Sequence, residues 1–170
     1  LNASGRDFKK IPGSPIAYWV SDKVRDIFRL SSKIEDIAIP KQGLATGDNE
    51  HFMRCWFEVS LKNIGFDLNE NEATASNLKW FPYNKGGVYR KWFGNIEYVV
   101  NWENNGYEIR NFYDKHRKLK SRPQNIHYFF KECITWTLLS SSYFGVRYIP
   151  KGFIFDINGI YNPLTKNYNF

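Results

Sequence analysis

Cysteine is scarce in this chain of 170 residues, since only Cys55 and Cys133 occur and both lie in apolar or aromatic runs. Two cysteines cannot supply a disulfide framework for a protein of this size. We therefore expect both to be small buried hydrophobic residues. Such cysteine usage is typical of a protein in the reducing cytoplasm.

Long hydrophobic runs are also missing. No segment approaches the roughly 18 to 20 apolar residues that a membrane span needs, and residues 1–10 lack the apolar core of a signal peptide. We expect no membrane partner. The chain begins with Leu1 and has a single methionine, Met53, so we expect it to be a piece of a longer polypeptide.

The motifs of catalytic and metal sites are absent as well. The three histidines lie far apart with no second ligand at metal-binding spacing, so no metal site is predicted. Methyl transfer to a flipped base needs a glycine-rich donor loop and an Asn or Asp followed by two prolines and an aromatic residue, whereas Asn162-Pro163-Leu164 has one proline. The acid-x-Lys spacing of a magnesium nuclease occurs only at Asp7-Phe8-Lys9, with no earlier acid, and nucleophile motifs are missing. We therefore predict no catalytic residue and no bound cofactor in this chain.

Positive charge, by contrast, is abundant and concentrated. The net charge is +7, which favours a polyanionic partner. Between Lys79 and Lys131 eleven basic residues stand against four acidic ones, which leaves +7, the charge of the whole chain. The aromatic content of 18% would also suit a carbohydrate-binding module. Neutral sugars offer nothing for a basic cluster to bind, so we expect a nucleic acid.

An amphipathic helix is predicted over residues 15–30. Ser14 and Pro15 form a helix start, and a set of apolar residues then recurs at helical spacing: Ile16, Trp19, Val20, Val24, Ile27 and Phe28. This stripe packs either on its own domain or on a neighbour. A short segment, 34–39, follows, and Pro40 closes it.

Alternating apolar and polar residues predict strands in the rest of the chain: 53–59, 96–102, 134–138, 146–148 and 153–157, with a turn at 150–152 between the last two. We expect a loop at 80–87, a polar stretch at 60–78 with a short helix near 73–78, a strand end at 104–106, and either a helix or a strand at 107–113.

Strands outnumber helices in this pattern. We therefore predict a single α+β domain with a mainly antiparallel sheet and an amino-terminal helix. Residues 1–40 would form a linker and the helix, residues 41–159 the main domain, and residues 160–170 a frayed tail.

Two regions of the basic stretch have the residue types of a DNA contact. The densest cluster runs from Lys115 to Arg122 and is followed by Gln124 and Asn125. Lysine and arginine neutralise phosphates, while Arg, Gln and Asn can pair with base edges. The loop 83–87, with Arg90, Lys91 and Trp92, is the second region, because its glycines permit close approach to a phosphate and Tyr83 offers a face for stacking.

Residues 43–52 carry the most specific pattern in the sequence. Two glycines bracket Thr46, and Asp48 and Asn49 follow, which predicts a tight polar turn leading into a strand. The order Gly, aliphatic, any residue, Thr-Gly, any residue, Asn and then an aromatic resembles the entry of the specificity region in single-chain adenine-specific DNA methyltransferases. An ordinary hairpin turn is the alternative for these ten residues.

Further segments extend the resemblance over about residues 11–159. They are Lys79–Gly87, Arg90–Asn95, Glu97–Asn104, Ser121–Asn125, Tyr128–Glu132, Ile134–Trp136, Arg147–Tyr148 and Gly152–Asp156. In this order they resemble the PglX family, the large adenine-specific DNA methyltransferases of BREX phage-defence systems, in the region that follows the catalytic domain.

This resemblance implies a full-length enzyme that methylates adenine with S-adenosylmethionine and so marks host DNA. The catalytic domain would lie upstream, and this chain would be the target-recognition domain that binds duplex DNA and confers sequence specificity. The alternative is a protein-docking scaffold of the same defence complex. Which residues read bases does not carry over from the family. The predicted DNA-binding residues are Thr46, Asn49, Tyr83, Asn84, Lys85, Arg90, Lys91, Arg110, Arg117, Lys118, Lys120, Arg122, Gln124 and Asn125.

Overall fold

The computed structural model describes residues 4–33, 36, 38–137, 143–156 and 159–161. The chain divides into two compact units, residues 1–37 and residues 38–170. No helix in the described part of the chain is long and apolar enough to cross a membrane.

The described part of the first unit includes the helices α1 (Gly5–Phe8) and α2 (Asp22–Leu30). Helix α2 covers only the second half of the helix predicted over 15–30. Ser21 caps it, because its hydroxyl accepts a hydrogen bond from the backbone N–H of Val24 at 3.4 Å. Ser14 instead has a left-handed φ of 48°, which is not the extended geometry of a helix cap. The prediction is therefore wrong for residues 15–21.

The apolar stripe of the first unit is exposed. Trp19, Ile27 and Leu30 are 66%, 57% and 73% exposed, whereas Arg25 is the buried side chain of α2. The Arg25 guanidinium donates to the Asp22 carboxylate at 2.9 Å and to the carbonyl of Ala17. The periodic apolar residues of α2 therefore build no core within this unit.

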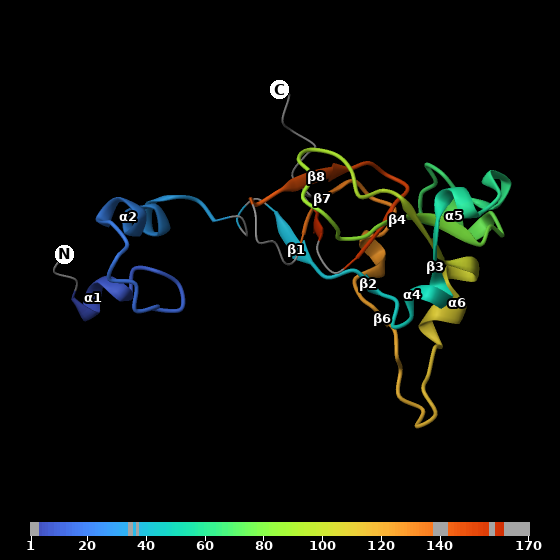
Figure 1. The fold of residues 1–170 in the computed structure, drawn as a ribbon, viewed down its shortest axis with the longest axis horizontal. Helices are drawn as coiled ribbons and strands as arrows, with labels where there is room; N and C mark the ends of the chain where they lie inside the picture. Colours follow the sequence, from blue (N-terminus) through green and yellow to red (C-terminus); the bar gives the residue numbers. More distant parts are fainter. Residues whose placement is uncertain (1–3, 34–35, 37, 138–142, 157–158, 162–170) are drawn as a thin grey trace. The chain divides into compact units, whose positions relative to one another are not determined.

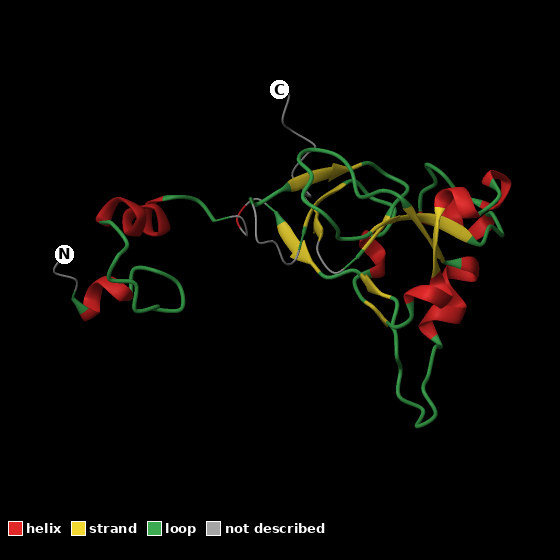
Figure 2. Cartoon of the chain, in the orientation of Figure 1, coloured by secondary structure: helices red, strands yellow, loops and turns green. Residues whose placement is uncertain are grey.

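The second unit is built from short strands with three helices among them (Figures 1 and 2). The strands are β1 (Ile39–Lys41), β2 (Leu44–Ala45), β3 (Met53–Cys55), β4 (Trp80–Asn84), β5 (Tyr98–Asn101), β6 (Arg122–Pro123), β7 (Cys133–Trp136), β8 (Val146–Ile149), β9 (Ile154–Phe155) and β10 (Gly159–Tyr161). The helices are α4 (Asn49–Phe52), α5 (Glu70–Ala75) and α6 (Glu103–Arg110), and single 3₁₀ turns are η1 (Trp56–Glu58), η2 (Leu61–Asn63) and η3 (Ile126–Tyr128).

These strands form three small sheets in place of one. Their orders are β1-β10-β7-β8, β2-β6 and β3-β5-β4-β9. All these pairings are antiparallel except that of β4 with β9, which is parallel. The α+β class is confirmed, with the strands shared among separate sheets. Helices α4, α5 and α6 lie together at one side of the unit, away from β1, β7 and β8 (Figure 2).

Strand β4 occupies a segment that the sequence predicted as a loop. It pairs on one side with β5 and on the other with β9, and its residues from Phe81 to Asn84 are buried. The glycine pair at 86–87, which suggested a loop, lies just beyond the strand. The aromatic residues before it favour burial, and this preference decides the local structure.

The other strand predictions are confirmed in position but not in length. Strand β5 lies within 96–102, β9 lies within 153–157 with the turn at 150–152 before it, and β8 extends one residue beyond the predicted 146–148. Strand β3 ends at Cys55, where η1 begins, so the prediction of a strand to residue 59 is wrong there. Strand β7 ends at Trp136, and residue 138 lies outside the described part.

Two predictions near the ends of the second unit need correction. Pro40 lies inside β1 and does not close the segment before it; residues 34, 35 and 37 are not described. Residues 159–161 form β10 between β1 and β7, so the tail does not begin at residue 160. Backbone pairing on both edges fixes this short strand.

The helices follow local capping signals. Helix α5 starts at Glu70, earlier than the predicted 73, because the Asn69 side chain accepts hydrogen bonds from the N–H groups of Asn71 and Glu72. Helix α6 resolves the open choice at 107–113 in favour of a helix that ends at Arg110. Residues 104–106 inside α6 all have positive φ, which Gly106 and the asparagines tolerate. Strand β5 ends before them, as predicted.

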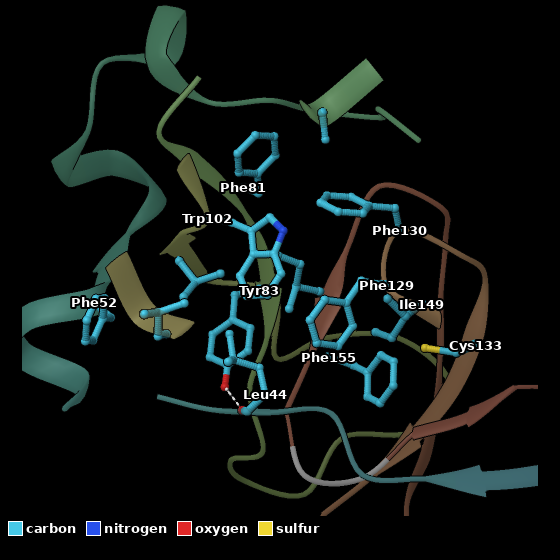
Figure 3. Packing of buried hydrophobic residues seen from close by; sticks show 14 residues of the cluster. Leu44, Phe52, Phe81, Tyr83, Trp102, Phe129, Phe130, Cys133, Ile149 and Phe155 are labelled. Carbon is cyan, nitrogen blue, oxygen red and sulfur yellow. Dashed lines mark hydrogen bonds between the residues drawn. The ribbon is translucent and has the colours of Figure 1, made fainter. Parts of the chain in front are cut away.

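The core of the second unit lies between its sheets and is rich in aromatic side chains (Figure 3). Phe81, Trp102 and Phe129 are fully or nearly fully buried, and the rings of Trp102 and Phe129 meet edge to face at 5.2 Å. Cys133 belongs to this core, as predicted, and burial raises the pKa of its thiol to about 12. Cys55 is half-buried at the end of β3.

Candidate nucleic-acid interface

The turn at residues 43–48 leads from β2 into α4. Gly47 has a left-handed φ of 75°, and Asp48 caps α4 by accepting a hydrogen bond from the N–H of His51. The Thr46 hydroxyl donates to the side-chain oxygen of Asn49 at 2.6 Å. The predicted polar turn is therefore present, and a single helical turn separates it from the strand β3.

Both glycines of this turn lie against other backbone segments. A Cβ on Gly43 would overlap the carbonyl oxygens of Phe155 and Asp156. A Cβ on Gly47 would lie 2.5 Å from the carbonyl oxygen of Lys120. Strand β2 also pairs with β6, which begins two residues after Lys120. The turn therefore packs between the end of β9 and the segment that carries the densest basic cluster.

That segment forms a narrow hairpin, residues 112–120, which extends away from the sheets between α6 and β6 (Figure 1). Its two arms are joined by backbone hydrogen bonds from the N–H of Lys120 to the carbonyl of Phe112 and from the N–H of Asp114 to the carbonyl of Lys118, both 2.8 Å. An isolated bridge pairs Tyr113 with Leu119 between them. The basic cluster therefore sits on a defined backbone.

Asp114 organises the tip of the 112–120 hairpin. One of its carboxylate oxygens accepts hydrogen bonds from the N–H groups of His116 at 2.8 Å and Lys118 at 2.9 Å. Its carbonyl accepts a further bond from the N–H of Arg117, which has a left-handed φ of 61°. The side chains of residues 115–120 are exposed. Four cations therefore point into solvent from a hydrogen-bonded tip.

The base of the hairpin is braced by aromatic and charged side chains. The His51 ring stacks on Phe112 with a centroid distance of 5.8 Å, and His51 Nε2 lies 2.5 Å from the Glu108 carboxylate. The hydrogen bond from His51, joined by one from Asn101, lowers the pKa of Glu108. The ammonium of Lys120 lies 4.3 Å from the centre of the Phe112 ring. Helices α4 and α6 thus both hold the hairpin.

The second predicted contact region is a loop after β4. Lys85 pairs with Asp156 at 3.1 Å, and Arg90 lies 3.5 Å from Glu97. Lys91 is exposed and its ammonium lies over the ring of Trp92, which is 68% exposed. A pocket of about 260 Å³ lies under the loop, lined by residues 85–88 together with Arg90, Asn95, Glu97 and Tyr98. This loop therefore offers exposed cations and exposed aromatic side chains, of which Trp92 is the most exposed.

A second pocket joins the 43–48 turn to this loop. Its volume is about 240 Å³, and it is lined by residues 45–49 with Lys85 and Asp156. The structure therefore brings together two of the three predicted regions around a polar hollow. The 112–120 hairpin contacts the same turn from its other side through Gly47.

The structure corrects the expectation that Tyr83 and Asn84 lie at the surface. Tyr83 is fully buried, and its hydroxyl donates to the carbonyl of Leu44 at 2.7 Å (Figure 3). The same hydroxyl lies 3.2 Å from the Asp156 carboxylate. Burial, with the neighbouring Asp156 charge, raises the pKa of this phenol. Asn84 is also buried and donates to the carbonyl of Asn95. Neither side chain can reach a base while β4 is paired on both edges.

The remaining predicted residues divide by exposure. Thr46 is buried and serves the turn. Asn125 has a left-handed φ of 50°, and its amide donates to the carbonyl of Gln42, so it shapes the end of β6. The side chains of Lys85 and Gln124 are half-buried. The exposed members are Asn49, Arg90, Lys91, Arg110, Arg117, Lys118, Lys120 and Arg122.

Three residues of this surface were absent from the prediction. His51 and Glu108 are 57 positions apart, so no local pattern connects them. Asp114 does have a local signal, because an Asp before a short polar run commonly accepts from the backbone two residues on.

No protein-family model matches the chain. The chain is 45% identical over 156 residues to the "Adenine-specific methyltransferase PglX" of Lacticaseibacillus casei (strain Zhang), a match that covers 91% of this chain. It is 43% identical over 159 residues to the "Adenine-specific methyltransferase BrxX" of Escherichia coli O9:H4 (strain HS), covering 93% of this chain. The chain spans only 13% and 12% of the length of these two relatives. It is thus homologous to one segment of these adenine-specific methyltransferases.

Proposed function

We propose that this chain, homologous to a segment of PglX and BrxX, is the DNA target-recognition part of an adenine-specific methyltransferase. In this role it binds duplex DNA and contributes sequence specificity, while another part of the longer protein methylates the adenine with S-adenosylmethionine. The proposal places the whole protein in the cytoplasm, in a phage-defence or restriction-modification system.

The 112–120 hairpin is the observation that carries this proposal. It presents Lys115, Arg117, Lys118 and Lys120 on one projecting element whose backbone is fixed by internal hydrogen bonds. Side chains of this kind neutralise phosphates and release counterions from the duplex. An element that protrudes from the body can follow a groove without the sheets approaching the DNA.

The flanking elements extend the same surface. Arg122 is exposed on β6 at the root of the hairpin, followed by the half-exposed Gln124, and both residue types can pair with base edges. Arg90 and Lys91 lie exposed on the loop after β4. We propose phosphate contacts for the lysines and leave Tyr83 and Asn84 out of the contact set.

A docking role is the second candidate, favoured by a different face. An apolar pocket of about 340 Å³ is lined mainly by Trp56, Leu61, Phe66, Pro82 and Phe153. Phe57, beside it in sequence, is 67% exposed. Exposed aromatic side chains are enriched in protein interfaces. This face suits another part of the methyltransferase or another defence protein.

The DNA proposal is tested by titrating a fluorescent mixed-sequence duplex with the chain at several salt concentrations. On this mixed-sequence duplex, which offers no preferred base, replacing Arg117, Lys118 and Lys120 together with Ala is expected to weaken binding and to reduce the slope of log K against log salt by about 3, since each cation that meets a phosphate contributes about 0.9. A control variant with Lys9, Lys62 and Lys151 replaced by Ala removes the same charge from exposed sites outside the basic stretch.

The control is expected to keep most of the original slope. Equal losses in both variants would assign the binding to net charge and contradict a hairpin contact. Absence of duplex binding by the unmodified chain, even at low salt, would overturn the DNA role and leave the docking role.

A further inference from the structure

The backbone of Arg117 is unusual within this chain. Ten non-glycine residues of the described part have positive φ, and six of them are Asn or Asp, the residue types that tolerate it best. The exceptions with large side chains are Trp92, Arg117 and Phe130. Each of these three therefore needs a reason for holding a conformation that costs free energy.

Phe130 and Trp92 have such a reason inside the protein. Phe130 is buried and belongs to the core of the second unit, so its packing compensates the backbone cost. The backbone of Trp92 is held on both sides, because its N–H donates to Val146 and its carbonyl accepts from Tyr148, each at 2.9 Å. Arg117 differs from Phe130 because it is exposed, and from Trp92 because only its N–H, bonded to the Asp114 carbonyl at 3.0 Å, is held by a described residue.

The Arg117 side chain gains nothing within the described part of the chain. It is exposed, and its guanidinium makes no hydrogen bond or ion pair with a described residue. By comparison, Arg110 donates a hydrogen bond to the Asn105 carbonyl, and the guanidinium of Arg90 lies near the Glu97 carboxylate. Glycine or asparagine at position 117 would satisfy the Asp114 turn at lower cost. An arginine at this costly position therefore points to a use outside the chain.

We propose that Arg117 is a specificity-determining residue that reads guanine in the major groove, an inference that rests on the proposed DNA role. A two-stranded ribbon fits the major groove, which is about 12 Å wide. Guanine presents O6 and N7 there, and the fork of an arginine binds both acceptors at once. The hydrogen bonds that Asp114 accepts from the backbone already order the tip in the free protein. DNA binding therefore costs little conformational entropy at this tip.

Lys118 provides a matched comparison within the same tip. It carries the same charge one residue on, its N–H also bonds to Asp114, and its ammonium is a point donor that favours phosphate without reading a base. If Arg117 reads a base, its replacement should reduce sequence preference, whereas replacement of Lys118 should reduce affinity for all duplexes.

The test begins with selection of preferred sites from a random duplex pool by the unmodified chain. Affinities for the selected duplex and for a mixed duplex are then compared for Arg117→Gly, Arg117→Lys and Lys118→Ala. Arg117→Gly is expected to keep or raise the thermal midpoint, because glycine relieves the left-handed backbone, while the preference for the selected duplex falls on the order of tenfold or more. Arg117→Lys is expected to keep the salt slope and lose the same preference.

Lys118→Ala is expected to weaken binding to both duplexes equally. Replacing the key guanine of the selected site with 7-deazaguanine, which lacks the N7 acceptor, should reduce the preference of the unmodified chain and leave that of Arg117→Gly unchanged. An undiminished preference in Arg117→Gly, or binding without any preferred site, would overturn the guanine reading and leave the DNA role intact. Failure of the unmodified chain to bind any duplex would overturn the DNA role, and this inference with it.

Discussion

Strand β4 and the 112–120 hairpin use their aromatic residues in opposite ways. In β4, Phe81 and Tyr83 are both buried, and the strand is paired on both edges. In the hairpin, Phe112 is half-buried and anchors only the base, while Tyr113 is 52% exposed. Basic residues adjoin the aromatic ones in both segments, since Lys79 and Lys85 flank β4, yet one segment lies inside a sheet and the other leaves the body.

The difference lies in where the hydrogen bonds and apolar contacts go. The Tyr83 hydroxyl donates to the Leu44 carbonyl and lies beside the Asp156 carboxylate, so this polar group of the strand has its partners within the protein. At the tip of the hairpin, the backbone N–H groups of His116 and Lys118 donate to the Asp114 carboxylate. The cationic side chains of the tip are therefore not needed to satisfy the backbone and stay exposed. A segment whose backbone is satisfied locally can therefore expose its side chains at no cost in unpaired backbone groups.

The largest expected effect is on the free energy of unfolding and belongs to Tyr83, in the buried strand β4. Tyr83→Ala should lower the free energy of unfolding by about 3 to 5 kcal/mol, since it removes a fully buried aromatic ring. Tyr83→Phe should cost about 1 to 2 kcal/mol, because it leaves the Leu44 carbonyl without its donor. Chemical denaturation measures both.

Tyr107, which is 69% exposed on α6, supplies the control. Tyr107→Ala should change stability by no more than about 0.5 kcal/mol. A comparably small effect at Tyr83 would mean that β4 is not the centre of its sheet in solution.

Gly47 tests the junction between the hairpin and the 43–48 turn. Gly47→Ala should cost about 1 to 3 kcal/mol, because a Cβ there meets the Lys120 backbone and φ is 75°. Since relief of this overlap displaces the root of the hairpin, duplex binding should weaken as well. Denaturation and duplex titration of the same variant check both expectations.

Gly86→Ala is the matched control, because no atom lies within 4 Å of a Cβ at Gly86 and its φ is not in the left-handed region. It should fold with nearly unchanged stability. Equal costs at the two glycines would show that the Gly47 contact carries no special strain.

Elements of this fold that depend on local sequence patterns can be predicted, whereas elements that depend on contacts between distant segments cannot. Alternation correctly located β5, β8 and β9, because half-buried strands repeat every two residues. It failed for β4, where burial on both faces leaves no alternation to detect. It also overextended the helix before α2, because apolar spacing ignores the cap at Ser21.

The candidate site could be predicted only in part for a related reason. Charge density alone identified the basic stretch that became the 112–120 hairpin. Two partners far apart in sequence, His51 and Glu108, meet only once α4 and α6 are packed. Tyr83 was assigned to the surface because its position in the sheet depends on pairing with β5 and β9, which a single sequence does not specify.

The smallest expected effect belongs to the Glu108 brace and depends on pH. The hydrogen bond from His51 lowers the pKa of Glu108 below its unfolded value of about 4.5, so its contribution is present above that pH and is lost as pH falls through the folded value. Because the carboxylate is 48% exposed, Glu108→Gln should cost less than about 1 kcal/mol at neutral pH. The difference from the unmodified chain should shrink below pH 4.5, as followed by denaturation from pH 7 to pH 3. Glu50→Gln, on the same short helix as His51 and exposed, should show no such convergence, and a Glu108 effect that persists in acid would contradict an electrostatic brace.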